Sequence, residues 1–211
     1  MRLGGLSGNF FKMSEWISRL AYANILWIVF TLAGLIFFGF MPATVALFTV
    51  VRKWIKGEND VPVFSLFFKT YRNEFLKSNK LGLILFIFGY ILYIDLAFIP
   101  AEGMFYTLVR MGVLVISFLY IIVLLYMFPV YVHYDWKVSL YLKYAFILGV
   151  SYPILTLGMF VGLGILYTIL TIVPGIIPFF SVSLLALLLM KIAMLVFSKV
   201  ESLALNKPTV E

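Results

Sequence analysis

The stretch from Arg52 to Lys80, RKWIKGENDVPVFSLFFKTYRNEFLKSNK, decides how the rest of this sequence folds. It carries seven of the sixteen Lys and Arg residues of the chain, and three acidic residues. Apolar runs long enough to cross a membrane lie on both sides of it. Because short basic loops are retained on the cytoplasmic side of a membrane, we expect this stretch to lie in the cytoplasm.

The composition excludes a water-soluble fold. Of the 211 residues, 64% are hydrophobic and 12% are charged, and the mean hydropathy is +1.11. Soluble domains carry about 25% charged residues, so we expect an all-α, polytopic bundle of membrane helices that forms one domain over residues 1–211. The net charge of +7 does not indicate nucleic acid binding, because the basic residues flank apolar runs. The chain contains no cysteine, which excludes disulfides and thiolate metal sites.

About six membrane spans are predicted. The uncharged run Leu20–Val51 is too long for one crossing, and Pro42 predicts a turn at Gly39–Pro42 within it. Whether the short second span crosses completely stays open. The expected spans are Ser18–Phe38, Ala43–Lys56, Leu81–Ile99, Phe105–Val130, Ala145–Val173 with a bend at Pro153, and Phe179–Phe197.

The distribution of basic residues predicts that both termini are cytoplasmic. Six spans place fourteen of the sixteen Lys and Arg residues on one side, and the predicted outer turns then carry none. A five-span alternative would put Arg2, Lys12 and Arg19 outside, so six spans are favoured. The apolar run after Arg19 is too long for a signal peptide, and we expect the N-terminal segment to be retained.

The second half of the basic stretch predicts an amphipathic helix over Val63–Lys77. Its aromatic residues recur at helical spacing, while its basic residues avoid that stripe. One interpretation is a helix lying in the headgroup region among anionic lipids, and another is a docking helix for a partner subunit; both can hold. The residues concerned are Phe64, Phe67, Phe68, Tyr71 and Phe75 in the stripe, and Lys69, Arg72 and Lys77 beside it.

Few polar groups lie inside the predicted spans. Asp95 and Arg110 flank the same outer turn and are expected to form an ion pair, or else to reach the outer interface separately. Lys191 has no evident partner and is expected to extend toward the cytoplasmic interface. Gly158 and Gly162 form a G-x-x-x-G pattern that predicts close packing, within the bundle or against another chain.

Motifs for catalysis or metal binding are missing from the sequence. It has no P-loop and no H-E-x-x-H, and His133 is its one histidine. We interpret His133 as an interface residue near Tyr131 and Tyr134. We therefore expect no metal, no cofactor and no enzymatic activity.

Two groups of residues carry a resemblance to a known family. Met41-Pro42-Ala43-Thr44-Val45-Ala46-Leu47-Phe48 precedes the basic loop, and Phe128-Pro129 is followed by Leu142-Lys143-Tyr144-Ala145. In this order the motifs resemble the YesL-like family of small bacterial membrane proteins, over nearly the whole chain. Members are commonly encoded beside carbohydrate ABC importers and polysaccharide-degrading enzymes.

The resemblance implies a place in the bacterial cell membrane. It also implies an accessory or scaffold subunit of a carbohydrate ABC import complex, without ATPase activity of its own. Permease and ATPase subunits, besides membrane lipids, would then be its partners. A self-sufficient secondary transporter is the first alternative, although neither inverted repeats nor midplane polar clusters are evident. A membrane-embedded enzyme is the second.

Overall fold

The computed structural model describes residues 5–100 and 102–205, which fold into helices without strands. The described helices are α1 (Gly5–Ala33), α2 (Phe37–Ile55), α3 (Val63–Phe98), α4 (Met104–His133), α5 (Val138–Ser151), α6 (Pro153–Ile172) and α7 (Ile177–Leu205), with a short 3₁₀ helix at Pro174–Ile176. Six of them, all except α5, are long and apolar enough to cross a membrane. The predicted all-α, multi-pass membrane fold is therefore confirmed.

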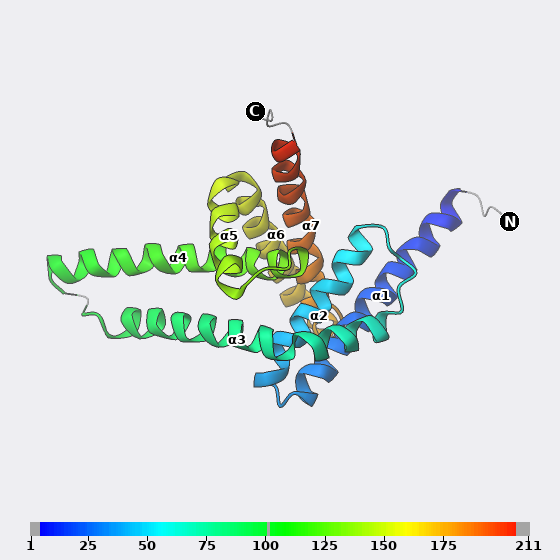
Figure 1. Cartoon of the computed structure of the whole chain (residues 1–211), viewed down its shortest axis with the longest axis horizontal. Coiled ribbons are helices and arrows are strands. Elements are labelled where there is room, and N and C mark those ends of the chain that lie inside the picture. Colours follow the sequence, from blue (N-terminus) through cyan, green and yellow to red (C-terminus); the bar gives the residue numbers. More distant parts are fainter. Residues whose placement is uncertain (1–4, 101, 206–211) are drawn as a thin grey trace.

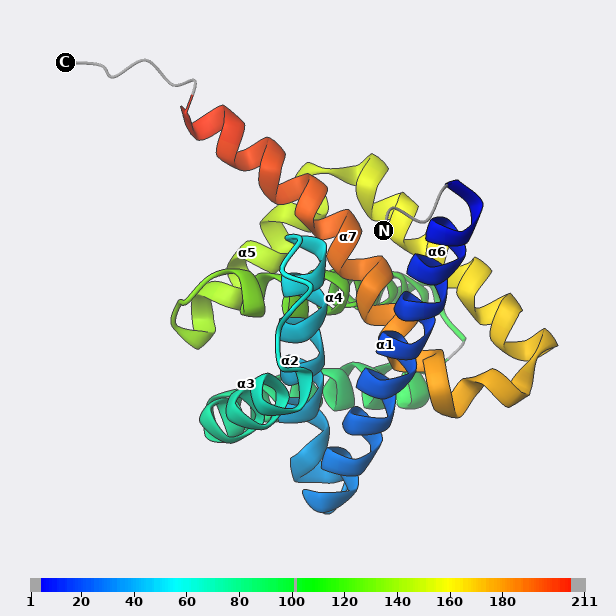
Figure 2. The same ribbon diagram turned by 90° about the vertical axis from the view of Figure 1, so that its right-hand side faces the viewer.

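Helix α2 lies at the centre of the bundle. It contacts α1, α3, α4 and α7, and the stretch from Pro42 to Phe48 is buried along its whole length. In Figure 2, α2 (light blue to cyan), α1 (blue) and α7 (orange to red) lie side by side at the centre of the bundle, and each contacts the other two. The ring of Phe48 stacks on Phe128 of α4, with ring centroids 5.3 Å apart. The family-like motif at Met41–Phe48 thus forms the core of the fold.

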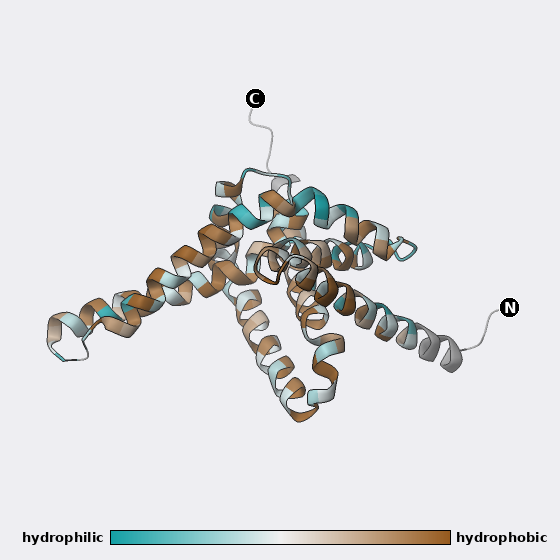
Figure 3. Cartoon of the chain, turned by 90° about the horizontal axis from the view of Figure 1, so that it is seen from below, coloured by the Kyte–Doolittle hydropathy of each residue, from teal (hydrophilic) through white to brown (hydrophobic). Residues whose placement is uncertain are grey.

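Helices α3 and α4 form an arm that extends away from this core (Figure 1). Large apolar side chains along the arm are exposed, including Phe86, Tyr93 and Phe105. In Figure 3 the arm is brown along most of its length, as expected for a surface that faces acyl chains.

The predicted turn at Gly39–Pro42 is wrong, because Pro42 lies inside α2 and the chain turns at Gly34–Ile36. Proline has no N–H, so it leaves the carbonyl of Phe38, four residues earlier, without its helical donor. The side chain of Asn79 on α3 donates a hydrogen bond to this carbonyl at 2.9 Å. A polar group on a neighbouring helix therefore makes the proline tolerable inside the membrane.

The predicted span Ala145–Val173 is wrong in a different way, because Pro153 ends one helix and begins another instead of bending one helix. The preceding residue, Tyr152, leaves the helical conformation with φ −121° and ψ 63°. Pro153 also removes the donor to Gly149, and the hydroxyl of Thr156 donates to that carbonyl at 2.7 Å. Of the two helices, only α6 is long and apolar enough to cross a membrane, and α5 is a separate short helix against α4.

The amphipathic segment and the third span are one continuous helix, α3, rather than two elements. Neither Gly nor Pro interrupts the sequence between Lys77 and Leu81, so nothing ends the helix there. The structure also extends the predicted fourth and sixth spans by several residues, to the bounds of α4 and α7.

Candidate functional site

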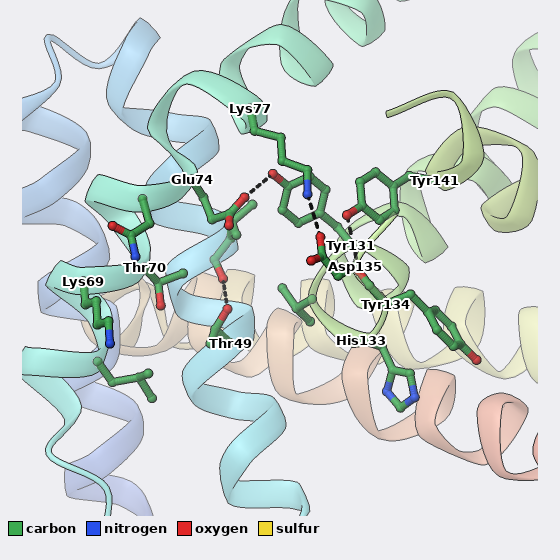
Figure 4. A pocket seen from close by; sticks show the side chains of 14 residues that line it. Thr49, Lys69, Thr70, Glu74, Lys77, Tyr131, His133, Tyr134, Asp135 and Tyr141 are labelled. Carbon is green, nitrogen blue, oxygen red and sulfur yellow. Dashed lines mark hydrogen bonds and ion pairs between the residues drawn. The ribbon is translucent and has the colours of Figure 1, made fainter. Parts of the chain in front are cut away.

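A polar pocket of about 370 Å³ lies between α2, the first half of α3 and the connection from α4 to α5. Figure 4 shows side chains from all three regions turned toward it. The polar residues that line it are Thr49, Lys69, Thr70, Asn73, Glu74, Lys77, Tyr131, His133, Tyr134, Asp135 and Tyr141. In a chain this apolar, such a collection of polar groups is the first candidate for a functional site.

Two oppositely charged residues of α3 hold the end of α4. Glu74 accepts a hydrogen bond from the Tyr131 hydroxyl at 2.7 Å, and Lys77 pairs with Asp135 at 3.0 Å. The ammonium of Lys77 also lies 5.5 Å from the ring centroid of Tyr131 and 5.4 Å from that of Tyr141. The two tyrosine rings therefore attract the ammonium by cation–π interaction, in addition to its ion pair with Asp135.

The connection between α4 and α5 is fixed by tyrosines. The Tyr141 hydroxyl accepts from the backbone N–H of Trp136 at 3.0 Å and donates to the Tyr134 carbonyl at 3.3 Å. The ring of Tyr134 stacks on Trp136 at 4.2 Å. Burial raises the pKa of the Tyr134 hydroxyl, and the nearby carboxylate of Glu201 adds to this effect. The hydroxyl therefore stays neutral, and the connection held by these contacts forms one wall of the pocket.

His133 lies at the edge of the pocket against α7. Its Nε2 lies 3.3 Å from Glu201, and its ring contacts Tyr134 and Phe197. The predicted contact with Tyr134 is present. Over the described residues, the structure contains no group of three His, Cys, Asp or Glu side chains that could hold a metal ion.

The predicted aromatic stripe on α3 is divided between two environments. Phe67 is fully buried, and its ring lies 5.2 Å from that of Phe30 on α1. Tyr71 also contacts Phe30, at 5.0 Å, and the ring of Phe75 packs against Tyr71. In contrast, Phe64 and Phe68 are 54% and 46% exposed. Phe67 and Tyr71 therefore hold α3 against α1, whereas Phe64 and Phe68 lie at the edge of this contact, with ring centroids 6.2 and 6.0 Å from that of Phe30.

The predicted basic face is divided as well. Lys69 and Arg72 are exposed and take part in none of the ion pairs between described residues. Lys77 instead points toward the exposed carboxylate of Asp135 (Figure 4). It lies off the aromatic stripe, as predicted, but its partner comes from a distant part of the sequence.

The structure does not form the predicted ion pair between Asp95 and Arg110. The two lie on α3 and α4 near the end of the arm, and the ion pairs of the described residues do not include them. Helices α3 and α4 make only sparse contacts along the arm, so the two side chains are not brought together.

The G-x-x-x-G pattern of α6 is used in part. A Cβ atom at Gly162 would lie 2.7 Å from Leu188 Cδ1 of α7, so this glycine permits close packing within the bundle. A Cβ at Gly158 would meet no atom within 4 Å. The predicted intrachain packing therefore holds at Gly162 but not at Gly158.

Sequence reasoning missed the charge network at the pocket. Glu74 is the one acidic residue in the first half of α3, and it comes one turn before Lys77. That reversal of charge in a basic helix was the available signal. It could not identify Tyr131 or Asp135, which lie more than fifty residues away along the chain.

Comparison with known proteins identifies the family. Residues 20–96 match the family described as a protein of unknown function, DUF624. The uncharacterized protein YteU of Bacillus subtilis (strain 168) is 45% identical over 201 residues, which cover 95% of this chain and 90% of YteU. YesL of the same organism is 44% identical, with 88% of each chain covered. YesV is 39% identical, with 89% of this chain and 91% of YesV covered. No solved structure matches the chain. The chain therefore belongs to the YesL-like family of membrane proteins.

Proposed function

We propose that this protein is an accessory membrane subunit of a carbohydrate ABC import complex, without ATPase activity of its own. It would lie in the bacterial cytoplasmic membrane with both termini in the cytoplasm. The family resemblance supports the importer as partner. The exposed face of α3 supports this helix as the place where the importer binds.

The division of the aromatic stripe is the observation that carries this proposal. Phe67 and Tyr71 hold α3 against Phe30, so the helix is fixed in position. Phe64 and Phe68 then remain exposed on a rigid surface, with their rings stacked 6.3 Å apart. Rigid exposed aromatics beside an arginine are the usual anchors of a protein interface.

Arg72 completes this docking face, and Lys69 lies at its border with the pocket, which it also lines; we define the face as Phe64, Phe68, Lys69 and Arg72. Both basic side chains are exposed. The pocket network supports the face from behind, since Glu74 and Lys77 tie the following turn of α3 to Tyr131 and Asp135.

The test is co-purification from native membranes in mild detergent, with a tag on the chain. We expect ABC permease and ATPase subunits, identified by mass spectrometry, to accompany the unaltered protein. Phe64→Ala/Phe68→Ala and Arg72→Lys should reduce their recovery at least about fivefold, since hot-spot residues contribute about 1–2 kcal/mol or more.

Leu83→Ala is the matched control, because Leu83 is an exposed apolar residue of the same helix within the arm. It should leave recovery unchanged. If both α3 variants retain the importer subunits in full, with expression and insertion equal to the control, the docking proposal is wrong and the helix contacts lipid instead.

A further inference from the structure

We infer that α1 and α2 form a re-entrant hairpin, whose turn at Gly34–Ile36 ends inside the hydrocarbon layer. Both helices would enter the membrane from the surface that carries Lys77 and Asp135, and neither would open on the opposite surface. Length and composition alone allow each helix to cross. The contacts of the turn, the lengths of the helices and the chemistry of the turn indicate instead that the hairpin does not cross completely. None of these observations depends on the proposed function.

The first observation is the contact between the turn and α3. Asn79 donates to the carbonyl of Phe38 at 2.9 Å, just past the turn. Asn79 is two residues after Lys77, whose partner Asp135 has a side chain that is 98% exposed. An exposed ion pair belongs at the membrane surface, because charges within the hydrocarbon are costly. The contact at Asn79 lies about 28 Å along α3 before the end of that helix at Phe98, so Phe38 lies on the Lys77 side of the hydrocarbon core and not at its opposite surface.

Helix lengths lead to the same conclusion. On each helix a charged residue beside the apolar part marks the membrane surface, Arg52 on α2 and Lys77, with its exposed ion pair, on α3. From Arg52 to the start of α2 at Phe37 is about 22 Å, whereas from Lys77 to the end of α3 at Phe98 is about 32 Å, at 1.5 Å per residue. The arm is therefore long enough to cross a hydrocarbon core of about 30 Å. The apolar part of α2 is about 10 Å shorter than that of the arm.

The third observation is the chemistry of the turn. Residues 32–40, LAGLIFFGF, contain no polar side chain. Leu35 and Ile36 are 80% and 61% exposed, and Phe37 and Phe38 are also exposed. The turn at the end of the arm differs, because it presents the exposed carboxylate of Glu102. Exposing four large apolar side chains to water is unfavourable, whereas the acyl chains accept them.

The backbone of the turn is also suited to a medium without water. Leu35 and Ile36 have φ values of 57° and 64°, which are strained for side chains other than glycine. Ile36, with ψ −63°, is the centre of a γ-turn closed by Phe37 N–H donating to the Leu35 carbonyl at 2.7 Å. Gly34 N–H donates to Phe30 and Ile36 N–H to Thr31. In hydrocarbon the backbone must pair internally in this way.

Site-directed spin labelling tests the inference, since the chain has no native cysteine. Single variants Leu35→Cys, Glu102→Cys and Ile91→Cys would be labelled in proteoliposomes. Depth would be measured from collisions with oxygen and with a water-soluble nickel chelate. All three side chains are exposed, so the labels displace no packing. Ile91 lies in the middle of the arm and serves as the mid-bilayer reference.

We expect the Leu35 label to resemble the Ile91 label, accessible to oxygen and protected from nickel. It should lie about 10 Å deeper than the Glu102 label, which should report the phosphate level. A Leu35 label at the depth of the Glu102 label would overturn the inference and establish a full crossing. A Leu35 label freely accessible to nickel would overturn it as well, by placing the turn in water.

Discussion

The side-chain amide of Asn24 on α1 is inserted between Pro178 and Val182 of α7. Asn24 Nδ2 donates to the Pro178 carbonyl at 2.7 Å, and Asn24 Oδ1 accepts from the Val182 N–H at 3.0 Å. In a regular α-helix, this N–H and this carbonyl would bond to each other. Oδ1 also accepts from the Ser183 N–H at 2.9 Å. The fully buried Asn24 therefore connects the first and last helices of the bundle.

Replacing this amide should destabilise the protein. Asn24→Leu removes all three hydrogen bonds and leaves buried backbone groups of α7 to find other partners, so we expect a loss of about 1–3 kcal/mol. The measurement is thermal unfolding in detergent. Ser183→Ala is the control, because its hydroxyl bonds only locally to Phe180, and it should shift the midpoint little. Equal midpoints for Asn24→Leu and the unaltered protein would contradict this role.

A second prediction ranks the two links between α3 and α4. The Asp135 carboxylate is almost fully exposed, so its ion pair with Lys77 should contribute at most about 1 kcal/mol. Tyr131 is buried, and its hydroxyl donates to a charged acceptor. Tyr131→Phe should therefore cost about 1.5–3 kcal/mol, more than Asp135→Asn. Denaturation by SDS in mixed micelles would measure both. The opposite ranking would show that the ion pair, and not the tyrosine, is the stronger link between α3 and the end of α4.

A third prediction concerns the break before α6. Thr156→Val keeps the shape of the side chain but removes the hydroxyl that donates to Gly149 and bonds Tyr126 at 3.0 Å. Because the Gly149 carbonyl is buried, we expect a loss of about 1–3 kcal/mol. Thr156→Ser keeps the hydroxyl and should retain most of the stability. Thermal midpoints in the same detergent compare the two, and equal losses would assign the effect to packing of the methyl group.

The sequence was sufficient for the fold class, because apolar composition and run length carry that information directly. It was insufficient for the turn, since Pro42 ends a helix unless another group satisfies the Phe38 carbonyl. That group is Asn79, forty-one positions further along the chain. The same reasoning applies to Pro153, although there the compensating hydroxyl of Thr156 is close in sequence.

The candidate site was predicted only where it depends on local spacing. Helical periodicity located the aromatic stripe, but which rings are buried depends on Phe30 of another helix. Likewise, the spacing of Asp95 and Arg110 from a common turn permitted a pair, but the separation of α3 and α4 decides against it. Contacts between distant segments have no signature in a single sequence.

The last prediction concerns orientation in the membrane. If the basic residues set the topology, Ser14 and Asn59 lie in the cytoplasm and Glu102 lies outside. Single cysteines at these positions should then behave differently toward a membrane-impermeant maleimide in intact cells: Glu102→Cys should label, and the other two should label only after the membrane is permeabilised. All three side chains are exposed, so protection would reflect the membrane and not burial.

The same three variants distinguish the alternative topologies. Labelling of Ser14→Cys in intact cells without labelling of Asn59→Cys would indicate that α1 and α2 together cross the membrane once. Labelling of Asn59→Cys with protection of Glu102→Cys would invert the whole chain and place the docking face of α3 outside. It would also remove the basis for contact with a cytoplasmic ATPase. A re-entrant hairpin and two full crossings both return the chain to the side from which it entered, so this experiment tests orientation independently of the depth of the Gly34–Ile36 turn.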